Sequence, residues 1–330
     1  MARLIDWIHA NGIRVPNSLA DQMDPEREEQ FTRAIVDAIP VVADNVVCHY
    51  FDAEDRGLDH MPSLMPPFQP TWVEARLDGQ AFGILYMGGS ATEFLDDYAP
   101  SSVRYPAPPL STRATSMSVA LLFSMAKGHK PYGPIMQLDL PLDERGYFMP
   151  EESDRLSRNA DAKRVDLYNP QIHQGRNSRK QYSVMIKDWW GSGSPGSEES
   201  PERKWNLNVG FEAVKALLFG IGMMNCSNVG TVEVEPAKRL SKKRETRYGR
   251  PLTQYKVIQV RPHLTARGRP HSDSERTVSE GTPLHVCRGH FKTYEEDRPL
   301  MGRHTGTFWW KAQVRGAKEQ GEIVHEYEVE

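Results

Sequence analysis

Four residues near the end of the chain could take part in phosphate chemistry. They occur at every second position and are Arg288, His290, Lys292 and Tyr294. A β-strand directs every second side chain to the same face. Arginine and lysine supply permanent positive charge, histidine exchanges a proton near neutral pH, and tyrosine donates a hydrogen bond or a proton. The spacing therefore predicts one strand face that meets an anion.

These residue types would suffice to cleave RNA without a metal ion. A base must take the proton of the 2′-hydroxyl group, an acid must protonate the leaving oxygen, and cations must stabilise the pentacoordinate phosphate. His290 is the candidate base or acid, with Tyr294 as its partner acid. Arg288 and Lys292 are the candidate phosphate ligands. The same types also bind phosphate in proteins that cleave nothing, so binding and cleavage both stay open.

A β-hairpin would position this face. Segment 284–294 and segment 306–316 both alternate in the strand manner, and pairing them predicts a sheet with one apolar face and one basic face. We place Trp309, Lys311 and Arg315 on the basic face, and Phe308 and Trp310 in the core. Trp309 is the candidate for stacking on a base, with an edge-packing tryptophan as the alternative.

Charge is distributed unevenly along the chain. The formal net charge is −3, but residues 238–315 hold 18 Lys and Arg against 7 Asp and Glu. Such asymmetry indicates a region that binds a polyanion on an otherwise acidic body. The alternative is that these cations only keep the surface soluble.

A second basic element precedes the hairpin. Pro236 suits the first position of a helix, and Gly249 and Pro251 are stop signals. The enclosed cations that we assign to nucleic-acid binding are Lys238, Arg239, Lys242, Lys243 and Arg247. Such a helix could track a phosphate backbone, and a solvated helix is the alternative reading.

No metal or cofactor is predicted. Five histidines and one cysteine lie in the same region, at His263, His271, His285, His290, His304 and Cys287. They include no compact ligand pair such as HxxxH or CxxC, and carboxylates are sparse around them. Residues 191–196 spell GxGxxG, but an acidic, proline-containing tract follows in place of a helix.

The remaining pattern predicts an α+β protein. A helix begins near Asp24-Pro25 and ends before Pro40, and strands are expected at 46–51, 71–77, 81–87, 118–125 and 134–140. The Asp78-Gly79 pair predicts a tight hairpin between the second and third of these strands. A buried helix is expected from 207 to 221, with strands at 231–235 and 252–262.

This order predicts two domains. Residues 1–141 would form a sheet-rich N-terminal domain, residues 142–202 a polar arm and a linker rich in Gly, Ser and Pro, and residues 203–330 a C-terminal α+β domain. The apolar run at 211–224 contains Glu212 and Lys215 and is too short to span a bilayer. With no secretory pattern at the N-terminus, we expect a cytoplasmic protein that does not contact membranes.

The closing motif carries a resemblance. Cys287-Arg-Gly-His-Phe-Lys292, Gly306-Thr-Phe-Trp-Trp310 and Val314-Arg-Gly316 resemble a group of uncharacterised proteins encoded by tailed phages and prophages. The resemblance implies a mobile-element context in a bacterial host and no site roles. The alternating Arg, His, Lys and Tyr also look loosely like the residues of metal-independent RNases of the barnase and RelE-type toxin class.

Binding of RNA or DNA is thus the leading functional prediction, with an RNase activity as its sharper form. The alternative is a non-enzymatic phage interaction protein, either a virion or assembly component or an inhibitor of a host protein. In that case the basic face would meet an acidic protein partner. The sequence does not indicate an oligomeric state.

Overall fold

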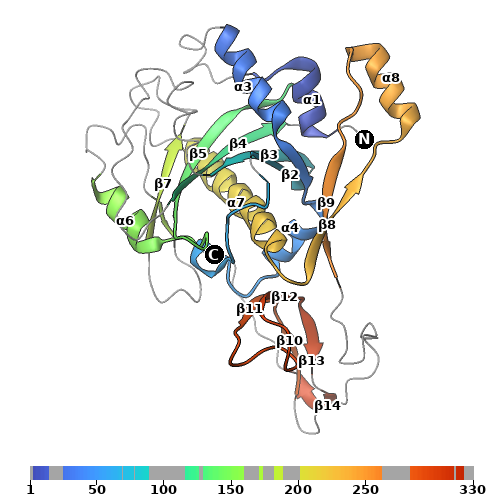
Figure 1. Cartoon of the computed structure of the whole chain (residues 1–330). Helices are drawn as coiled ribbons and strands as arrows, with labels where there is room; N and C mark the ends of the chain where they lie inside the picture. The colour runs from blue at the N-terminus through green and yellow to red at the C-terminus, as the bar shows by residue number, and fades with distance from the viewer. Residues whose placement is uncertain are drawn as a thin grey trace.

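The computed structural model (Figure 1) describes residues 3–14, 25–68, 70–77, 79–88, 116–125, 129–159, 171–173, 182–188, 201–261, 283–315 and 317–322. Within these ranges, nine strands form a mixed sheet in the order β6-β7-β5-β4-β3-β2-β1-β9-β8. The strands are β1 (Ile39–Val42), β2 (Thr71–Leu77), β3 (Gln80–Met87), β4 (Ser116–Met125), β5 (Tyr132–Leu142), β6 (Gln171–His173), β7 (Tyr182–Asp188), β8 (Val229–Val234) and β9 (Tyr255–Val260). β1 is parallel to both of its neighbours, and the other pairs are antiparallel.

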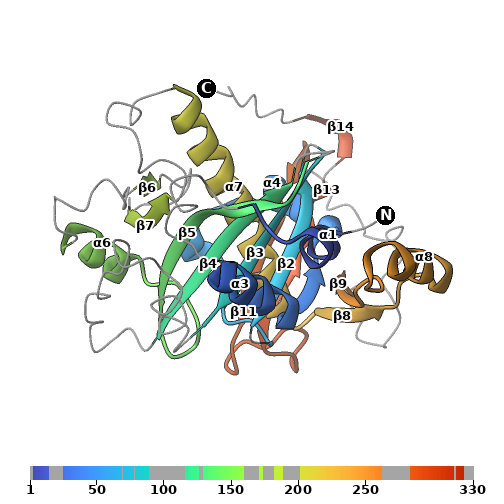
Figure 2. The ribbon, with the colours of Figure 1, turned by 90° about the horizontal axis from the view of Figure 1, so that it is seen from above.

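Helices cover both faces of the sheet, as the view from above shows (Figure 2). α1 (Leu4–Asn11) and α3 (Pro25–Asp37) lie on one face, and α4 (Asp44–Phe51) and α7 (Pro201–Met224) lie on the other. α6 (Pro150–Asn159) lies beside β7 and β5, α8 (Lys238–Tyr248) connects β8 to β9, and a short 3-10 helix, η1 (Leu58–His60), follows α4. Helices together with a mostly antiparallel sheet confirm the predicted α+β class.

The larger hydrophobic core lies between the sheet and α7. Val214, Leu217, Leu218 and Ile221 on α7 are completely buried, which confirms the predicted buried helix. The same helix buries a charge, because Lys215 is 1% exposed and its Nζ lies 2.5 Å from the Oε1 of Glu212. Burial lowers the pKa of Lys215, and Glu212 counteracts this shift. The pair lies beside α4, since Tyr50 Oη donates to Glu212 Oε2 at 2.6 Å.

Several predicted elements are confirmed. β2 and β3 pair antiparallel as predicted, and Gly79, just before β3, has a φ of +79° that favours glycine. β4 pairs antiparallel with β5, and the helix predicted after Asp24 is α3. The segment at 142–202 contains α6, β6 and β7 within the described residues. Its GxGxxG run lies outside them.

The strand predicted at 46–51 is wrong, because these residues belong to α4. Val46, Val47 and Tyr50 are buried, and their spacing of one and four positions matches one face of a helix. β-branched residues in a short apolar run suggested a strand, but burial against α7 determined the structure. The parallel strand β1, just before α4, was not predicted as a strand.

The main sheet takes strands from both predicted domains. β9, from the segment 203–330, pairs with β1 at Val41–Lys256 and Val42–Val257. α7, from the same segment, packs on β2, β3, β4 and β5. The two predicted segments therefore share one sheet and one core.

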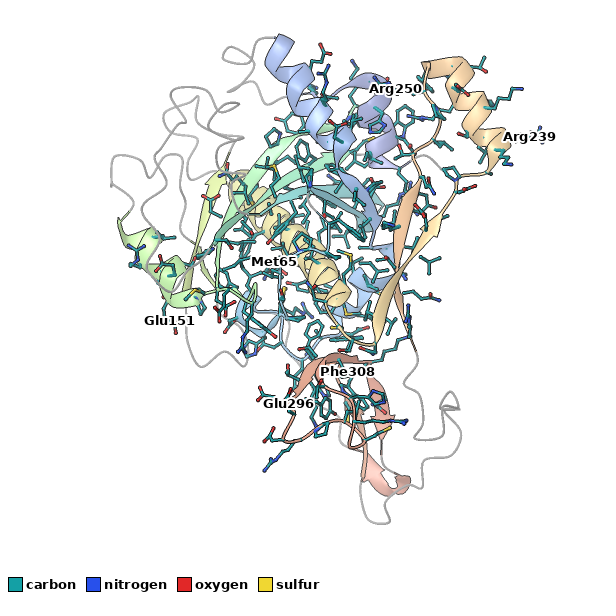
Figure 3. All side chains as sticks on the ribbon, in the orientation of Figure 1. Met65, Glu151, Arg239, Arg250, Glu296 and Phe308 are labelled. Atoms are coloured by element: carbon teal, nitrogen blue, oxygen red, sulfur yellow. The ribbon has the colours of Figure 1, made fainter. Side chains whose placement is uncertain are left out.

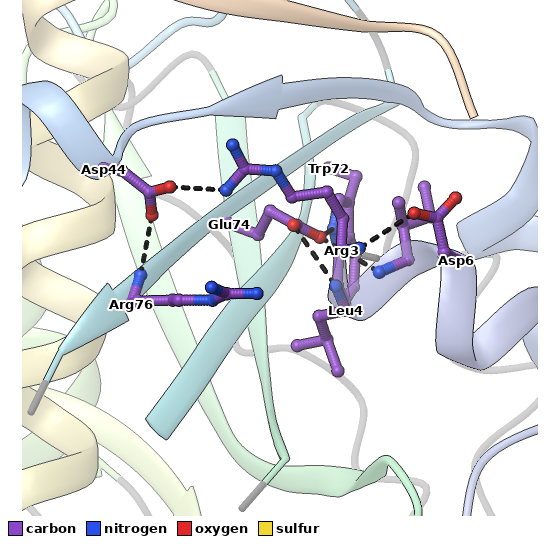
Figure 4. A network of polar contacts seen from close by, with 8 residues as sticks. Arg3, Leu4, Asp6, Asp44, Trp72, Glu74 and Arg76 are labelled. Carbon is purple, nitrogen blue, oxygen red and sulfur yellow. Dashed lines mark hydrogen bonds and ion pairs between the residues drawn. The ribbon is translucent and has the colours of Figure 1, made fainter. Parts of the chain in front are cut away.

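A polar network attaches α1 to the sheet (Figure 4). The buried Glu74 carboxylate on β2 accepts from Leu4 N at 3.2 Å, Ile5 N at 3.0 Å and Trp72 Nε1 at 2.9 Å. The first N–H groups of a helix have no partner within the helix, so Glu74 satisfies two of them from another element. Burial raises the pKa of Glu74, and its hydrogen bonds and the charge of Arg3 act against that rise.

No helix within the described ranges is long and apolar enough to cross a membrane.

Candidate nucleic-acid interface

α8 lies at one end of the molecule, at the tip of the β8–β9 ribbon (Figure 1). The predicted stop at Gly249 is confirmed: this residue has a left-handed φ of +74°, and its N–H donates to Glu245 O at 2.8 Å. The helix begins at Lys238, two residues after the predicted start at Pro236.

Nearly all cations of α8 point into solvent. The exposed cations at 238–250 are Lys238, Arg239, Lys242, Lys243, Arg247 and Arg250. Figure 3 labels Arg239 and Arg250, which lie at opposite ends of the helix. Glu245 is the one acidic residue in this range. The surface made by these six cations, here called the α8 surface, is a dense positive patch.

Arg244 is the exception and acts as an anchor. It is 8% exposed, and its guanidinium donates to the carbonyl oxygen of Asp6 on α1. The same group lies 5.4 Å from the ring centroid of Trp7 and 5.0 Å from that of Tyr248, within the range of a cation–π interaction. One buried arginine therefore holds α8 against α1 while the others face outward.

The predicted hairpin is present at the other end of the molecule. β10 (Pro283–Cys287) pairs antiparallel with β13 (Gln313–Arg315), and β11 (His290–Tyr294) pairs antiparallel with β12 (Gly306–Trp310). β14 (Ala317–Glu322) adds to β10. The pairing of β10 with β13 continues in the same alignment as the pairing of β11 with β12. The first strand of the hairpin is interrupted at Arg288 and Gly289, between β10 and β11.

The interruption joins the hairpin to the end of α4. Gly289 forms a parallel bridge with Ala53, with Gly289 N donating to Asp52 O at 3.3 Å and Glu54 N donating to Gly289 O at 2.8 Å. A Cβ on Gly289 would lie 2.6 Å from the Trp309 ring. Only glycine allows this close approach.

A buried asparagine fixes the second strand. Asn228 is 7% exposed, and its side chain both donates to Trp309 O and accepts from Trp309 N, each at 2.9 Å. Ser227 N donates to Thr307 O at 2.7 Å. The hairpin is therefore attached to the segment just after α7 by one backbone hydrogen bond from Ser227 and by two bonds of the Asn228 side chain.

The predicted composition of the two faces is wrong. Residues directly opposite in an antiparallel pair share a face, and the register pairs His290 with Trp310, Lys292 with Phe308 and Phe291 with Trp309. Trp309 is 1% exposed and packs on Phe291 at 4.8 Å and on Phe219 at 5.2 Å between ring centroids. Trp309 is a core residue, and Trp310 lies on the face of His290.

The four candidate catalytic residues are only partly brought together. His290, Lys292 and Tyr294 follow one another along the same face of β11, whereas Arg288 precedes the strand and is half-buried. Lys292 is exposed, and its Nζ lies 5.0 Å from the Tyr294 ring centroid. Tyr294 packs edge-to-face on Phe308 at 5.8 Å.

The remaining predicted cations do not join this face. Lys311 is exposed, and its positive charge lowers the pKa of His49 on α4. Arg315 pairs with His285 in the register, and its side chain lies outside the described residues. The α8 surface and the hairpin are far apart in Figure 1, so the two elements that were predicted to be basic do not form one surface.

His49 lies where the hairpin meets the body. Its ring centroid is 6.0 Å from that of Trp309, and its Nδ1 is 4.0 Å from Cys48 Sγ. Burial lowers the pKa of His49, the charge of Lys311 lowers it further, and Asp52 acts in the opposite direction.

Metal ligands do not cluster in the described part of the chain, where no three His, Cys, Asp or Glu side chains could hold an ion together. Of the predicted histidines, His263 and His271 lie outside that part.

Sequence reasoning missed Trp310, Asn228 and Arg244. The glycine at position 289 is a signal that could have revealed the interruption of the strand, because glycine within a strand indicates an irregularity or a close approach. The partners of Asn228 and Arg244 are 81 and 238 residues away, so no local pattern indicates them.

Comparison of the chain with protein families, curated proteins and solved structures gives no match.

Proposed function

We propose that this protein binds nucleic acid through the α8 surface. The observation that carries the proposal is that buried Arg244 holds α8 against α1, while five cations of the helix and Arg250 just after it are exposed. Double-stranded DNA and RNA present phosphates at regular spacing, and each neutralised phosphate releases counterions. A helix with dense charge on a protruding element suits such a backbone.

A salt series tests this function. Labelled RNA and DNA should be retarded by the protein at low salt, and the retardation should weaken steeply as salt rises. Lys243→Glu should reduce binding, whereas Arg145→Glu, at an exposed site far from α8, should not. Absence of binding to either polymer at low salt would contradict the proposal.

RNA cleavage is a second candidate activity, and one contact favours it. His290 Nδ1 lies 3.2 Å from the carbonyl oxygen of Arg288. A carbonyl oxygen only accepts, so Nδ1 donates and Nε2 of the neutral ring carries the lone pair that a general base needs. With RNA in EDTA, the wild-type chain should cleave and His290→Ala should not. Undiminished cleavage by the variant would exclude this histidine.

The resemblance to phage and prophage proteins supports placing this activity in mobile-element biology. The rival from another class is a non-enzymatic protein whose α8 surface meets an acidic protein partner. The two classes predict different ligands for the α8 surface: nucleic acid in the first class and an acidic protein in the second. Strong binding of a polyanionic protein together with no nucleic-acid binding would favour the rival.

A further inference from the structure

Four cations of α8 form two rows along the helix. Successive residues of an α-helix turn by about 100° around its axis, so side chains four positions apart lie in one row. Lys238 and Lys242 form one row, and Lys243 and Arg247 form the other. All four residues are exposed, and the two rows are about 140° apart around the axis. The helix therefore presents positive charge in two directions.

The body of the protein holds α8 along a third, narrow stripe. Arg244 is buried, and Tyr248 and Ser241, which lie about 40° and 60° from it around the axis, are half-buried. Ser241 Oγ accepts from Leu252 N at 3.1 Å, and the Tyr248 ring packs edge-to-face on Trp7 of α1. Because this stripe lies behind the two rows, both rows face away from the body.

Two exposed residues lie between the rows, Arg239 and Thr246. Their positions are about 140° and 160° from Arg244 around the axis, which is the side of the helix opposite the buried stripe. Figure 3 shows Arg239 extending away from the body, and Thr246 Oγ1 donates to Lys242 O at 3.0 Å. Glu245, the one carboxylate of the helix, lies between the first row and the buried stripe. A long arginine side chain is thus central to a face with cations on both sides.

This arrangement matches the major groove of duplex DNA. The groove is about 12 Å wide and admits one α-helix, with a phosphate backbone along each wall and base edges on its floor. Two rows of cations suit the two backbones, and an arginine between them reaches the base edges, where arginine pairs with the O6 and N7 atoms of guanine. Duplex RNA has a deep and narrow major groove that side chains cannot read. The arrangement therefore favours DNA over RNA.

We propose that α8 enters the major groove of duplex DNA, with one row of cations on each phosphate backbone and Arg239 bonded to a guanine on the groove floor. The proposal rests on the nucleic-acid function proposed above, and it names the ligand and the mode of binding. The two rows supply affinity, because phosphate contacts carry no sequence information directly. Arg239 supplies recognition, because contacts to base edges do carry it.

Four duplexes of equal length test the groove: alternating G–C DNA, the same DNA with 7-deazaguanine, the same DNA with inosine in place of guanine, and alternating G–C RNA. 7-Deazaguanine lacks the N7 acceptor of the major groove, whereas inosine lacks only the amino group of the minor groove. The wild-type protein should bind the 7-deazaguanine duplex about 3- to 10-fold more weakly than the guanine duplex, as the loss of one hydrogen bond predicts. Its affinity for the inosine duplex should not change, and it should bind the RNA duplex more weakly than the DNA at equal salt.

Two variants separate recognition from affinity. Arg239→Gln should remove the difference, so that the guanine and 7-deazaguanine duplexes bind equally. Lys243→Gln removes one charge from a row, and it should weaken binding of both duplexes while keeping the difference between them. The thermal midpoints of both variants should show that the fold is retained.

Each contrary result has a distinct meaning. Equal wild-type affinity for the guanine and 7-deazaguanine duplexes, sensitivity to inosine alone, or tighter binding of RNA would overturn the groove proposal while leaving the α8 function intact. A difference that persists in Arg239→Gln would overturn the assignment of this arginine to guanine. No binding of any duplex would overturn both the groove proposal and the α8 function.

Discussion

Individual residues fix the hairpin to the body, and Gly289 is the most constrained of them. Its backbone joins the loop after α4, and the Trp309 ring occupies the space where a side chain would start. Because Gly289 has no side chain, its backbone can bridge to Ala53 while the Trp309 ring packs directly against it.

Gly289→Ala should destabilise the protein by about 1–3 kcal/mol, because the added methyl group overpacks a filled site. Urea unfolding measures the change, with the exposed Ala312→Ser as a control in the same hairpin. Unchanged stability of Gly289→Ala would show that Trp309 moves aside freely.

A histidine at the same junction makes stability depend on pH. Because burial and Lys311 lower the pKa of His49, the unfolded chain binds a proton at this residue more readily than the native chain. The contribution of neutral His49 is present above pH 6.5 and is lost as pH falls through its lowered pKa.

His49→Gln cannot become charged and should therefore flatten the fall of unfolding free energy below pH 6.5. Urea titrations at several pH values measure this slope, and the exposed His129→Gln is the matched control. Identical slopes for wild-type protein and His49→Gln would contradict the assignment.

At the scale of elements, α8 contacts α1 through Arg244 and through the edge-to-face pair of Trp7 and Tyr248, whose ring centroids are 6.0 Å apart. Arg244 combines a hydrogen bond to Asp6 with two aromatic contacts. The aliphatic part of a buried arginine contributes packing as well as charge.

Arg244→Met should cost about 1–3 kcal/mol, because Asp6 O loses its charged donor and the cation–π contacts disappear. Hydrogen exchange should then speed up in α8 while α7 keeps its protection. Lys243→Met, at an exposed position on the same helix, serves as the control. Equal exchange in both variants would mean that other contacts hold α8.

Elements with strong local patterns were predictable, and those that depend on distant partners were not. The Asp78-Gly79 turn, Gly249 and the apolar stripe of α7 each contain their own signal. The segment 46–51 became a helix because α7 lies beside it, and Glu74 caps α1 from 69 and 70 residues away.

The candidate site likewise combines a feature that local sequence predicts with one that it does not. The hairpin was predictable from two alternating segments, but its faces depend on register, and a slip of one residue moves every side chain to the other face. The turn at 295–305 sets that register, and its conformation includes Met301 at a φ of +54°. Nothing in the strand pattern itself decides between Trp309 and Trp310.

At the scale of the whole molecule, one sheet connects two different surfaces. β8 and β9 carry α8 at one end and meet the hairpin at the other, where Arg261 N donates to Asn228 O at 2.8 Å. The excess of cations that the sequence shows at residues 238–315 is therefore concentrated in space, with the densest positive charge on the α8 surface. The account predicts that most electrostatic attraction to nucleic acid comes from that helix.

The salt dependence of duplex DNA binding tests this central claim most directly. In a fluorescence anisotropy titration, Lys242→Gln/Lys243→Gln should reduce the magnitude of the slope of log K against log salt by about 1.8, near 0.9 for each phosphate contact removed. Arg145→Gln should leave the slope unchanged. A double variant with the slope and affinity of the wild-type protein would contradict the assignment of α8 as the nucleic-acid-binding surface.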